Sequence, residues 1–300
     1  MFNFKSDIQF INYFRLFNFV SLILILISVG FIFYKGLNFG VDFKGGTLIE
    51  LRVENDEIGI GDVRQSFIKM NLGDVNVKKF GKGNDYLIKF EQTDKNKENF
   101  IENIKTKLSK NLGGNFSFRR VENVGPKVSG ELLKSGLIAI VLSLSAMLIY
   151  IWIRFEWQFS LGAIIALIHD VIITIGFFSI LEFEINLSIV AAVLTIVGYS
   201  MNDTVVIFDR VRENLKKYSS KSINEISNLS INETLSRTII TSLTTLLALL
   251  SIFFFGGKIL HGFSFAMILG VIFGTYSSIF IANPILIKLK VNQKSVLKGE

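Results

Sequence analysis

The sequence contains no cysteine and only two histidines among its 300 residues. The lack of cysteine excludes disulfide bonds and thiolate metal sites, and two histidines make a histidine-rich metal site implausible. The sequence also lacks the motifs of an ATP-binding phosphate loop, a serine nucleophile elbow and a zinc-protease helix. We therefore predict no metal, no cofactor and no catalytic residue, and we expect a protein that is not an enzyme.

Charged residues are also scarce, at 19% of the chain, against about 25% in average soluble proteins. Half of the residues are hydrophobic, and they fall in long blocks that a soluble core would not require. Each block lies within the range of about 17–25 residues that a transmembrane helix needs. The first is too long for the hydrophobic region of a cleaved signal peptide. The sequence thus predicts a polytopic α-helical membrane protein with six transmembrane helices, at residues 16–34, 132–153, 159–180, 187–208, 239–255 and 263–287.

Lysine and arginine are distributed unevenly between the two sides of these spans. The short loops on one side contain Lys258 alone, whereas the other side carries a large excess. Because cytoplasmic loops are rich in these residues, we expect both termini in the cytoplasm and residues 35–131 outside it. The net charge of +7 then reflects the orientation of the chain in the membrane, where lipid is its surroundings. No nucleic-acid partner is expected. The cytoplasmic basic residues are Lys5, Arg15, Arg154, Arg210, Arg212, Lys216, Lys217, Lys221, Arg237, Lys288, Lys290, Lys294 and Lys298.

These spans divide the chain into four segments. Residues 1–34 are the cytoplasmic N-terminus and first helix, and residues 35–131 are an extracytoplasmic domain. Residues 132–287 form the remaining five helices, with a cytoplasmic loop at 209–238, and residues 288–300 are a cytoplasmic basic tail.

The extracytoplasmic segment predicts a small α+β domain. Alternating or short apolar runs indicate strands at 46–54, 75–80, 86–91 and 116–122, and helical patterns cover 61–72 and 97–112. This βαββαβ order is ferredoxin-like. Binding or packing is its expected role. Five residues beside the domain are candidate hinges, with ordinary turns an equal alternative: Gly40, Gly45, Gly46, Gly125 and Pro126.

The fourth span contains an aspartate, Asp203, within its apolar part. A carboxylate at bilayer depth costs about 3 kcal/mol even on a lenient scale, and such groups often serve proton or ion pathways. Helical spacing places Thr195, Tyr199 and Asn202 on the same side as Asp203. The alternative is a buried aspartate that a neighbouring helix satisfies, with no transport role.

Arg237 begins the fifth span, at a depth similar to that of Asp203. Thr241 heads a stripe of small and hydroxyl residues that follows it along the helix. An ion pair with Arg237 would favour ionised Asp203, and its loss would favour the protonated acid. The alternative is that Arg237 is an anchor that extends to the membrane surface.

Two further features have open interpretations. His169 and Asp170 lie near the middle of the third span, where they could relay protons or serve as hydrogen-bonding contacts between helices. The sixth span repeats small residues at every fourth position, which predicts close packing on another helix of this chain or of a partner. Those residues are Ala266, Gly270, Gly274 and Ser278.

Six stretches together resemble the SecF branch of the SecD/SecF family, within the resistance-nodulation-division superfamily. They are GLNFGVDFKGGTLIEL (36–51), VGPKVSGEL (124–132), YIWIRFEWQFSLGAIIALIHDVIIT (150–174), GYSMNDTVVIFDRVREN (198–214), SRTIITSLTTL (236–246) and GFSFAMILGVIFGTYSSI (262–279).

The resemblance implies a location in the bacterial cytoplasmic (inner) membrane and a SecD-like partner subunit. It further implies action beside the SecYEG translocon, where the proton-motive force assists the translocating preprotein. The proton-pathway acid of the family falls on Asp203, and its essential arginine falls on Arg237.

Two other functions compete with protein export. One is half of a two-subunit, proton-driven efflux permease of the same superfamily, which would co-purify with an outer-membrane duct. The other is a structural scaffold, which would keep its activity when Asp203 or Arg237 is neutralised.

Overall fold

The computed structural model describes residues 8–55, 57–79, 83–91, 97–113, 116–293 and 296. The predicted turn at 81–85, the N-terminus and the basic tail lie partly outside these residues. The chain folds as two compact units. One is Phe39–Gly136, and the other combines Met1–Asn38 with Leu137–Glu300.

The helical unit confirms the prediction of six spans, since the described residues include six helices long and apolar enough to cross a membrane. The sixth is interrupted, because α9 (Lys258–Ser277) continues through a short π-helix, η1 (Ser278–Ala282), into α10 (Asn283–Lys288). The others are α1 (Phe10–Lys35), α5 (Pro126–Arg154), α6 (Trp157–Ile180), α7 (Leu187–Lys217) and α8 (Ile223–Phe255).

Helices α7 and α8 extend well beyond the apolar blocks that predicted them. Their added turns contain charged side chains, which a hydropathy criterion excludes but which a helix outside the hydrocarbon accommodates. Arg210 bridges the two helices through an ion pair of 2.6 Å with Glu233, and it also pairs with Glu213. Ser222 and Glu225 form a capping box that fixes the start of α8.

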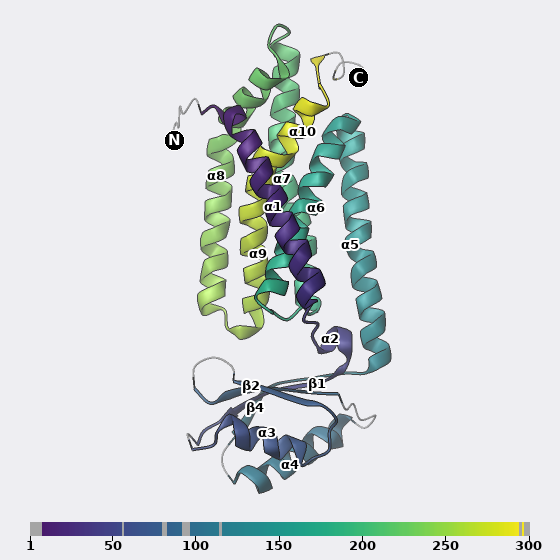
Figure 1. Ribbon diagram of the computed structural model, residues 1–300, viewed down its shortest axis with the longest axis vertical. Helices are drawn as coiled ribbons and strands as arrows, with labels where there is room; N and C mark the ends of the chain where they lie inside the picture. The colour runs from purple at the N-terminus through teal and green to yellow at the C-terminus, as the bar shows by residue number, and fades with distance from the viewer. Residues whose placement is uncertain are drawn as a thin grey trace. The chain divides into compact units, whose positions relative to one another are not determined.

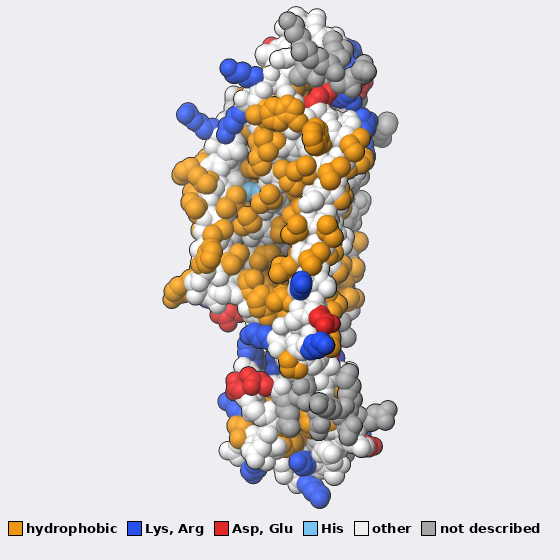
Figure 2. Space-filling model, turned by 90° about the vertical axis from the view of Figure 1, so that its right-hand side faces the viewer, with side chains coloured by type: hydrophobic (Ala, Val, Ile, Leu, Met, Phe, Trp, Pro, Cys, Tyr) orange, Lys and Arg blue, Asp and Glu red, His pale blue; other side chains and the backbone are white. Residues whose placement is uncertain are grey.

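Three helices form the centre of the helical unit and three surround it. The apolar windows of α6, α7 and the α9–α10 span are 50–61% buried, against 11–17% for α1, α5 and α8. Helices α5 and α8 stand at opposite edges of the bundle (Figure 1). Hydrophobic side chains are spread over the face of this unit that Figure 2 shows, and the charged ones gather toward its ends, as expected for a surface in contact with lipid.

The small-residue face of α9 packs on α7 of the same chain, which answers the question that the sequence left open. A Cβ atom at Gly270 would lie 2.3 Å from Ile196, and one at Gly274 would lie 2.9 Å from Ser200. Only glycine therefore permits this approach between the two backbones.

The π-helix ends at Ala282, two residues before Pro284. Proline has no N–H and its ring clashes with the carbonyl four residues earlier, so a regular helix cannot continue through it. The side chain of Asn283 donates to the Ser278 carbonyl (2.8 Å) and accepts from Ser227 of α8 (3.2 Å). The interruption is therefore hydrogen-bonded within the bundle.

The second unit has the predicted ferredoxin-like βαββαβ order. Its antiparallel sheet has the strand order β2-β3-β1-β4, and α3 and α4 lie on one face (Figure 1). Ile49, Leu51 and Val53 alternate along β1 and are buried against Phe67 and Leu108 of the two helices. The elements are α2 (Val41–Lys44), β1 (Gly46–Val53), α3 (Ile60–Ile68), β2 (Val75–Lys79), β3 (Asp85–Phe90), α4 (Lys97–Leu112) and β4 (Phe116–Val124).

The candidate hinge residues all fall inside this second unit. Gly45 and Gly46 have φ values of +77° and +113°, which favour glycine. A Cβ atom at Gly46 would also lie 2.6 Å from the Phe90 carbonyl oxygen. Gly40 precedes α2, and Gly125 accepts a backbone hydrogen bond from Ser129 just before α5. Local geometry thus accounts for two of the five residues, and a hinge at these positions stays a prediction.

Candidate functional site

Asp203 is buried between three helices of the bundle. Its carboxylate Oδ2 accepts a hydrogen bond from Thr275 of α9 at 3.2 Å, and Ser242 of α8 lies 3.5 Å away. Ser242 and Thr275 are themselves 2.6 Å apart. Because Thr275 donates to the carboxylate, Ser242 can donate to Thr275, and two hydroxyls take the place of water.

Arg237 does not form the predicted ion pair with Asp203 in the described part of the chain. Its side chain is exposed at the start of the apolar part of α8. The Asp203 carboxylate instead accepts its hydrogen bond from Thr275, with the Ser242 hydroxyl beside it.

The other residues predicted to lie beside Asp203 are distributed between two environments. Tyr199 is half-buried, and its hydroxyl donates to the Thr241 carbonyl of α8 at 3.3 Å. The Thr241 hydroxyl bonds to backbone carbonyls of its own helix. Asn202 and Thr195 are exposed on the surface of α7. The predicted polar stripe of α7 therefore lies along the surface of the bundle, and of its four residues only Asp203 is buried in the interior of the bundle.

A second buried cluster surrounds Asp170 on α6. Its Oδ2 accepts hydrogen bonds of 2.7 Å from Ser200 of α7 and from Ser277 of α9. Its Oδ1 lies 2.9 Å from Nδ1 of His169. Asp170 is completely buried, so these contacts replace the water that the carboxylate loses.

The two clusters are connected through α7 and α9. Ser200 precedes Asp203 by three residues, a rise of about 4.5 Å, and Thr275 and Ser277 are two residues apart. None of the four hydroxyl partners of these carboxylates was predicted from the sequence: Ser200, Ser242, Thr275 and Ser277. The small-residue face of α9 was the available signal, since Thr275 and Ser277 lie within that stretch.

The fold and this site define a polytopic helical membrane protein that holds two carboxylates inside its spans and carries a separate α+β unit. A family model described as "Protein export membrane protein SecD/SecF, C-terminal" matches residues 104–292. A second model, the SecD/SecF GG motif, matches residues 30–57. The chain belongs to the SecD/SecF family, which confirms the resemblance seen in the sequence.

Individual relatives support the same assignment. The chain is 49% identical to the protein translocase subunit SecF of Rickettsia bellii, over 94% of this chain and 93% of that protein. It is 46% identical to SecF of Rickettsia prowazekii, over 99% and 96%.

A solved structure shows the same fold. The crystal structure of SecDF from Thermus thermophilus, described as a translocon-associated membrane protein, matches with a TM-score of 0.86 at 33% identity. The match covers 97% of this chain and 40% of that one, so the chain spans less than half of SecDF.

Proposed function

We propose that this chain is an energy-coupling subunit of protein export, without enzymatic activity of its own. It works with a SecD-like partner beside the SecYEG translocon and uses the proton-motive force to assist the translocating preprotein. The observation that carries the proposal is the buried Asp203 carboxylate, held by the hydroxyls of Thr275 and Ser242 inside the bundle.

The mechanism depends on the charge of Asp203. A hydroxyl can donate to a carboxylate or accept from a carboxylic acid, so Ser242 and Thr275 suit both protonation states. Protonation removes the attraction between Asp203 and Arg237, and α7 and α8 then shift relative to each other. One charge that crosses 100 mV supplies about 2.3 kcal/mol, which matches ordinary coupling free energies of about 1–3 kcal/mol.

Polar side chains exposed on α7 and α8 indicate that a partner chain packs there. Arg237, Asn202 and Thr195 are exposed there, together with Thr244 and Ser251. Polar groups are costly in hydrocarbon, and they usually face another helix or a water-filled cavity. A SecD-like subunit packed on this face would cover them, since the related SecDF chain is much longer than this one.

We place the chain in the bacterial inner membrane with both termini in the cytoplasm and residues 35–131 outside. The support is the excess of lysine and arginine on one side of the spans. Arg154 and Arg210 are ion-paired with Asp209 and Glu233, but the orientation rule counts lysine and arginine and is not a net-charge rule. Movement of the outer unit through the candidate hinge residues completes the proposed cycle.

The test is preprotein export into membrane vesicles, with and without a proton gradient. Asp203→Asn keeps the shape of the side chain and removes its titration, so it should abolish the gradient-stimulated part of export. Asp209→Asn is the matched control, because Asp209 lies on the same helix and is 59% exposed. Undiminished stimulation in Asp203→Asn would favour a scaffold, and co-purification of an outer-membrane duct would favour efflux.

A further inference from the structure

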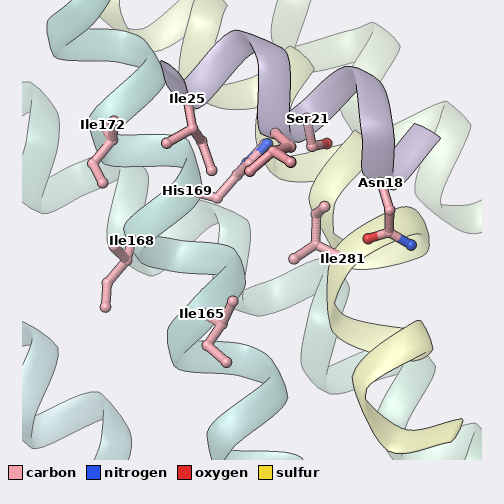
Figure 3. Close-up of a pocket in the computed structure, with 9 residues that line it drawn as sticks. Asn18, Ser21, Ile25, Ile165, Ile168, His169, Ile172 and Ile281 are labelled. Carbon is pink, nitrogen blue, oxygen red and sulfur yellow. The ribbon is translucent and has the colours of Figure 1, made fainter. Parts of the chain in front are cut away.

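A pocket of about 250 Å³ lies beside the Asp170 cluster, between α1 and α6 (Figure 3). Most of its wall is apolar, which suits its position in a membrane-spanning bundle. Three polar side chains also line it: Asn18 and Ser21 from α1, and His169 from α6. The apolar lining comes from Leu22, Ile25, Ile165, Ile168, Ile172 and Ile281.

His169 connects this pocket to Asp170. Its side chain is 2% exposed, and its Nδ1 lies 2.9 Å from Asp170 Oδ1. Its Nε2 is buried and has no hydrogen-bond partner among the described residues. In Figure 3 the imidazole reaches from α6 toward α1, beside Ser21. A buried nitrogen without a partner costs about 1–3 kcal/mol, so an occupant that can bond to Nε2 is favoured.

The polar groups that line the pocket present acceptors. The Tyr276 hydroxyl donates to the Phe17 carbonyl (2.7 Å), so Ser21 donates to Tyr276 (2.6 Å) and keeps its lone pairs. The amide nitrogen of Asn18 donates one N–H to the Phe14 carbonyl, which leaves its Oδ1 as an acceptor and its second N–H as a donor. In a neutral His169 whose Nδ1–H donates to Asp170, Nε2 is an acceptor as well.

Three acceptors select an occupant that donates hydrogen bonds. Water or hydronium does so, whereas a lipid chain does not. A bound water needs two to four polar partners and about 30 Å³; the pocket volume of about 250 Å³ is ample, and the polar side chains that line it are Asn18, Ser21 and His169.

We propose that this pocket is a proton-loading port for the His169–Asp170 pair. An O–H bond of a hydronium ion breaks, an N–H bond forms at Nε2, and a water molecule is left in the pocket. The imidazole becomes an imidazolium whose Nδ1–H stays on Asp170, so the charge of the pair changes from −1 to zero. Ser200 and Ser277 keep their bonds to Oδ2 throughout, and the proton leaves by the same port.

The groups that face the pair allow this exchange. Tyr276 of α9 stacks on His169, with ring centroids 5.9 Å apart, and is the titratable group on that side. Ser21 of α1 and Ser200 of α7 are neutral. The inference deepens the proposed function, because it gives the proton pathway a second site. Its link to Asp203 is Ser200, which contacts Asp170 and lies three residues before Asp203 on α7. The inference rests on the proposed function only for the purpose of this site.

Nitrogen-15 NMR of the full chain in lipid nanodiscs tests the port directly. The sequence has two histidines, so His261→Gln leaves His169 as the only labelled imidazole. We expect Nε2 to gain a proton as the pH falls, and this proton to exchange with water. Ile25→Phe, which fills the pocket from α1, should slow the exchange about tenfold or more, which corresponds to ~1.4 kcal/mol on the barrier.

Two further variants complete the test, one as a control for damage to α1 and one as a repeat from the opposite wall of the pocket. Ile27→Phe adds the same ring on α1 at a residue that is 44% exposed and outside the pocket lining, and it should leave the exchange unchanged. Ile168→Phe fills the pocket from α6, at a residue that is 43% exposed, and should repeat the effect of Ile25→Phe.

The port is refuted if Nε2 of the parent chain does not exchange with water, as a lipid-filled pocket would predict. It is also refuted if neither pocket variant slows the exchange. The measurement needs no partner, preprotein or gradient, so its failure would leave the proposal for Asp203 standing. Loss of the Asp203 effect in vesicles would equally leave the port intact.

Discussion

Replacement of Gly270 by alanine tests whether the close approach of α9 to α7 maintains the Asp203 cluster. The new Cβ atom would lie 2.3 Å from Cγ1 and 2.7 Å from Cδ1 of Ile196. Ile196 is fully buried, so its side chain has little room to rotate away. The two helices must therefore separate by about 1 Å before contact reaches the ordinary range, which begins at 3.4 Å.

That separation acts on a hydrogen bond between the same two helices. Thr275 lies 3.2 Å from Asp203, and an increase of this size would break the bond. Overpacking of a well-packed core costs about 1–3 kcal/mol. We therefore expect Gly270→Ala to lower the melting temperature of the purified chain and to weaken gradient-stimulated export.

Thermal unfolding in detergent measures the effect against two references. Gly30→Ala adds the same methyl group on α1, where nothing lies within 4 Å of the new Cβ. It should be neutral or stabilising by about 0.5–1 kcal/mol. The double variant Gly270→Ala/Ile196→Ala should lose less stability than the two single losses combined, by about 0.5–3 kcal/mol. A Gly270→Ala chain that melts with its parent, or strictly additive losses, would refute the packing argument.

Three further predictions concern other parts of the structure. Leu108→Ala in α4 removes a fully buried side chain and should destabilise the α+β unit by about 2–5 kcal/mol; thermal unfolding followed by circular dichroism measures this, with the exposed Lys107→Ala as control. Burial raises the pKa of the Tyr86 phenol above its usual 10.0, so the folded unit holds that proton more tightly than the unfolded chain does. Its contribution to stability is then complete below about pH 10 and decreases as the pH rises through the folded-state pKa. Tyr86→Phe should flatten this alkaline decrease and cost about 1 kcal/mol at neutral pH, because the bond to the Ile58 carbonyl (2.9 Å) is lost; unchanged pH dependence would contradict the reasoning. Tyr276→Phe removes the hydrogen bonds that join α9 to Ser21 and Phe17 of α1, and it should cost about 1 kcal/mol in thermal unfolding, whereas an unchanged melting temperature would show that these bonds do not contribute.

The helices and strands were predictable because their signals are local. Span length and period-two alternation depend on neighbouring residues, so six spans and the βαββαβ unit follow from the sequence alone. The end of α7 and the start of α8 were harder to predict. The last turns of α7 and the first turns of α8 are joined by ion pairs such as that of Arg210 with Glu233, and no single segment contains that information.

The partners of the buried carboxylates could not be predicted for a different reason. Serine and threonine in a helix often bond to their own backbone, as Thr241 and Thr244 do here. A hydroxyl stripe therefore does not show which members reach another helix. Ser242, one residue from Thr241, is the one that faces Asp203. An ion pair between Arg237 and Asp203 was possible from their similar depth, with an anchor at the membrane surface as the alternative, and the Arg237 side chain is exposed on the bundle.

The π-helical turn at Ser278–Ala282 sets the angular phase of the last helix. Ser277, before it, points to α6, and Asn283, after it, points to α8. Each residue of a helix turns the chain by about 100°, so removal of one residue from this turn would rotate every later side chain away from its neighbour. The length of this segment should therefore be fixed, and deletion of one residue should disrupt the contacts of both Ser277 and Asn283.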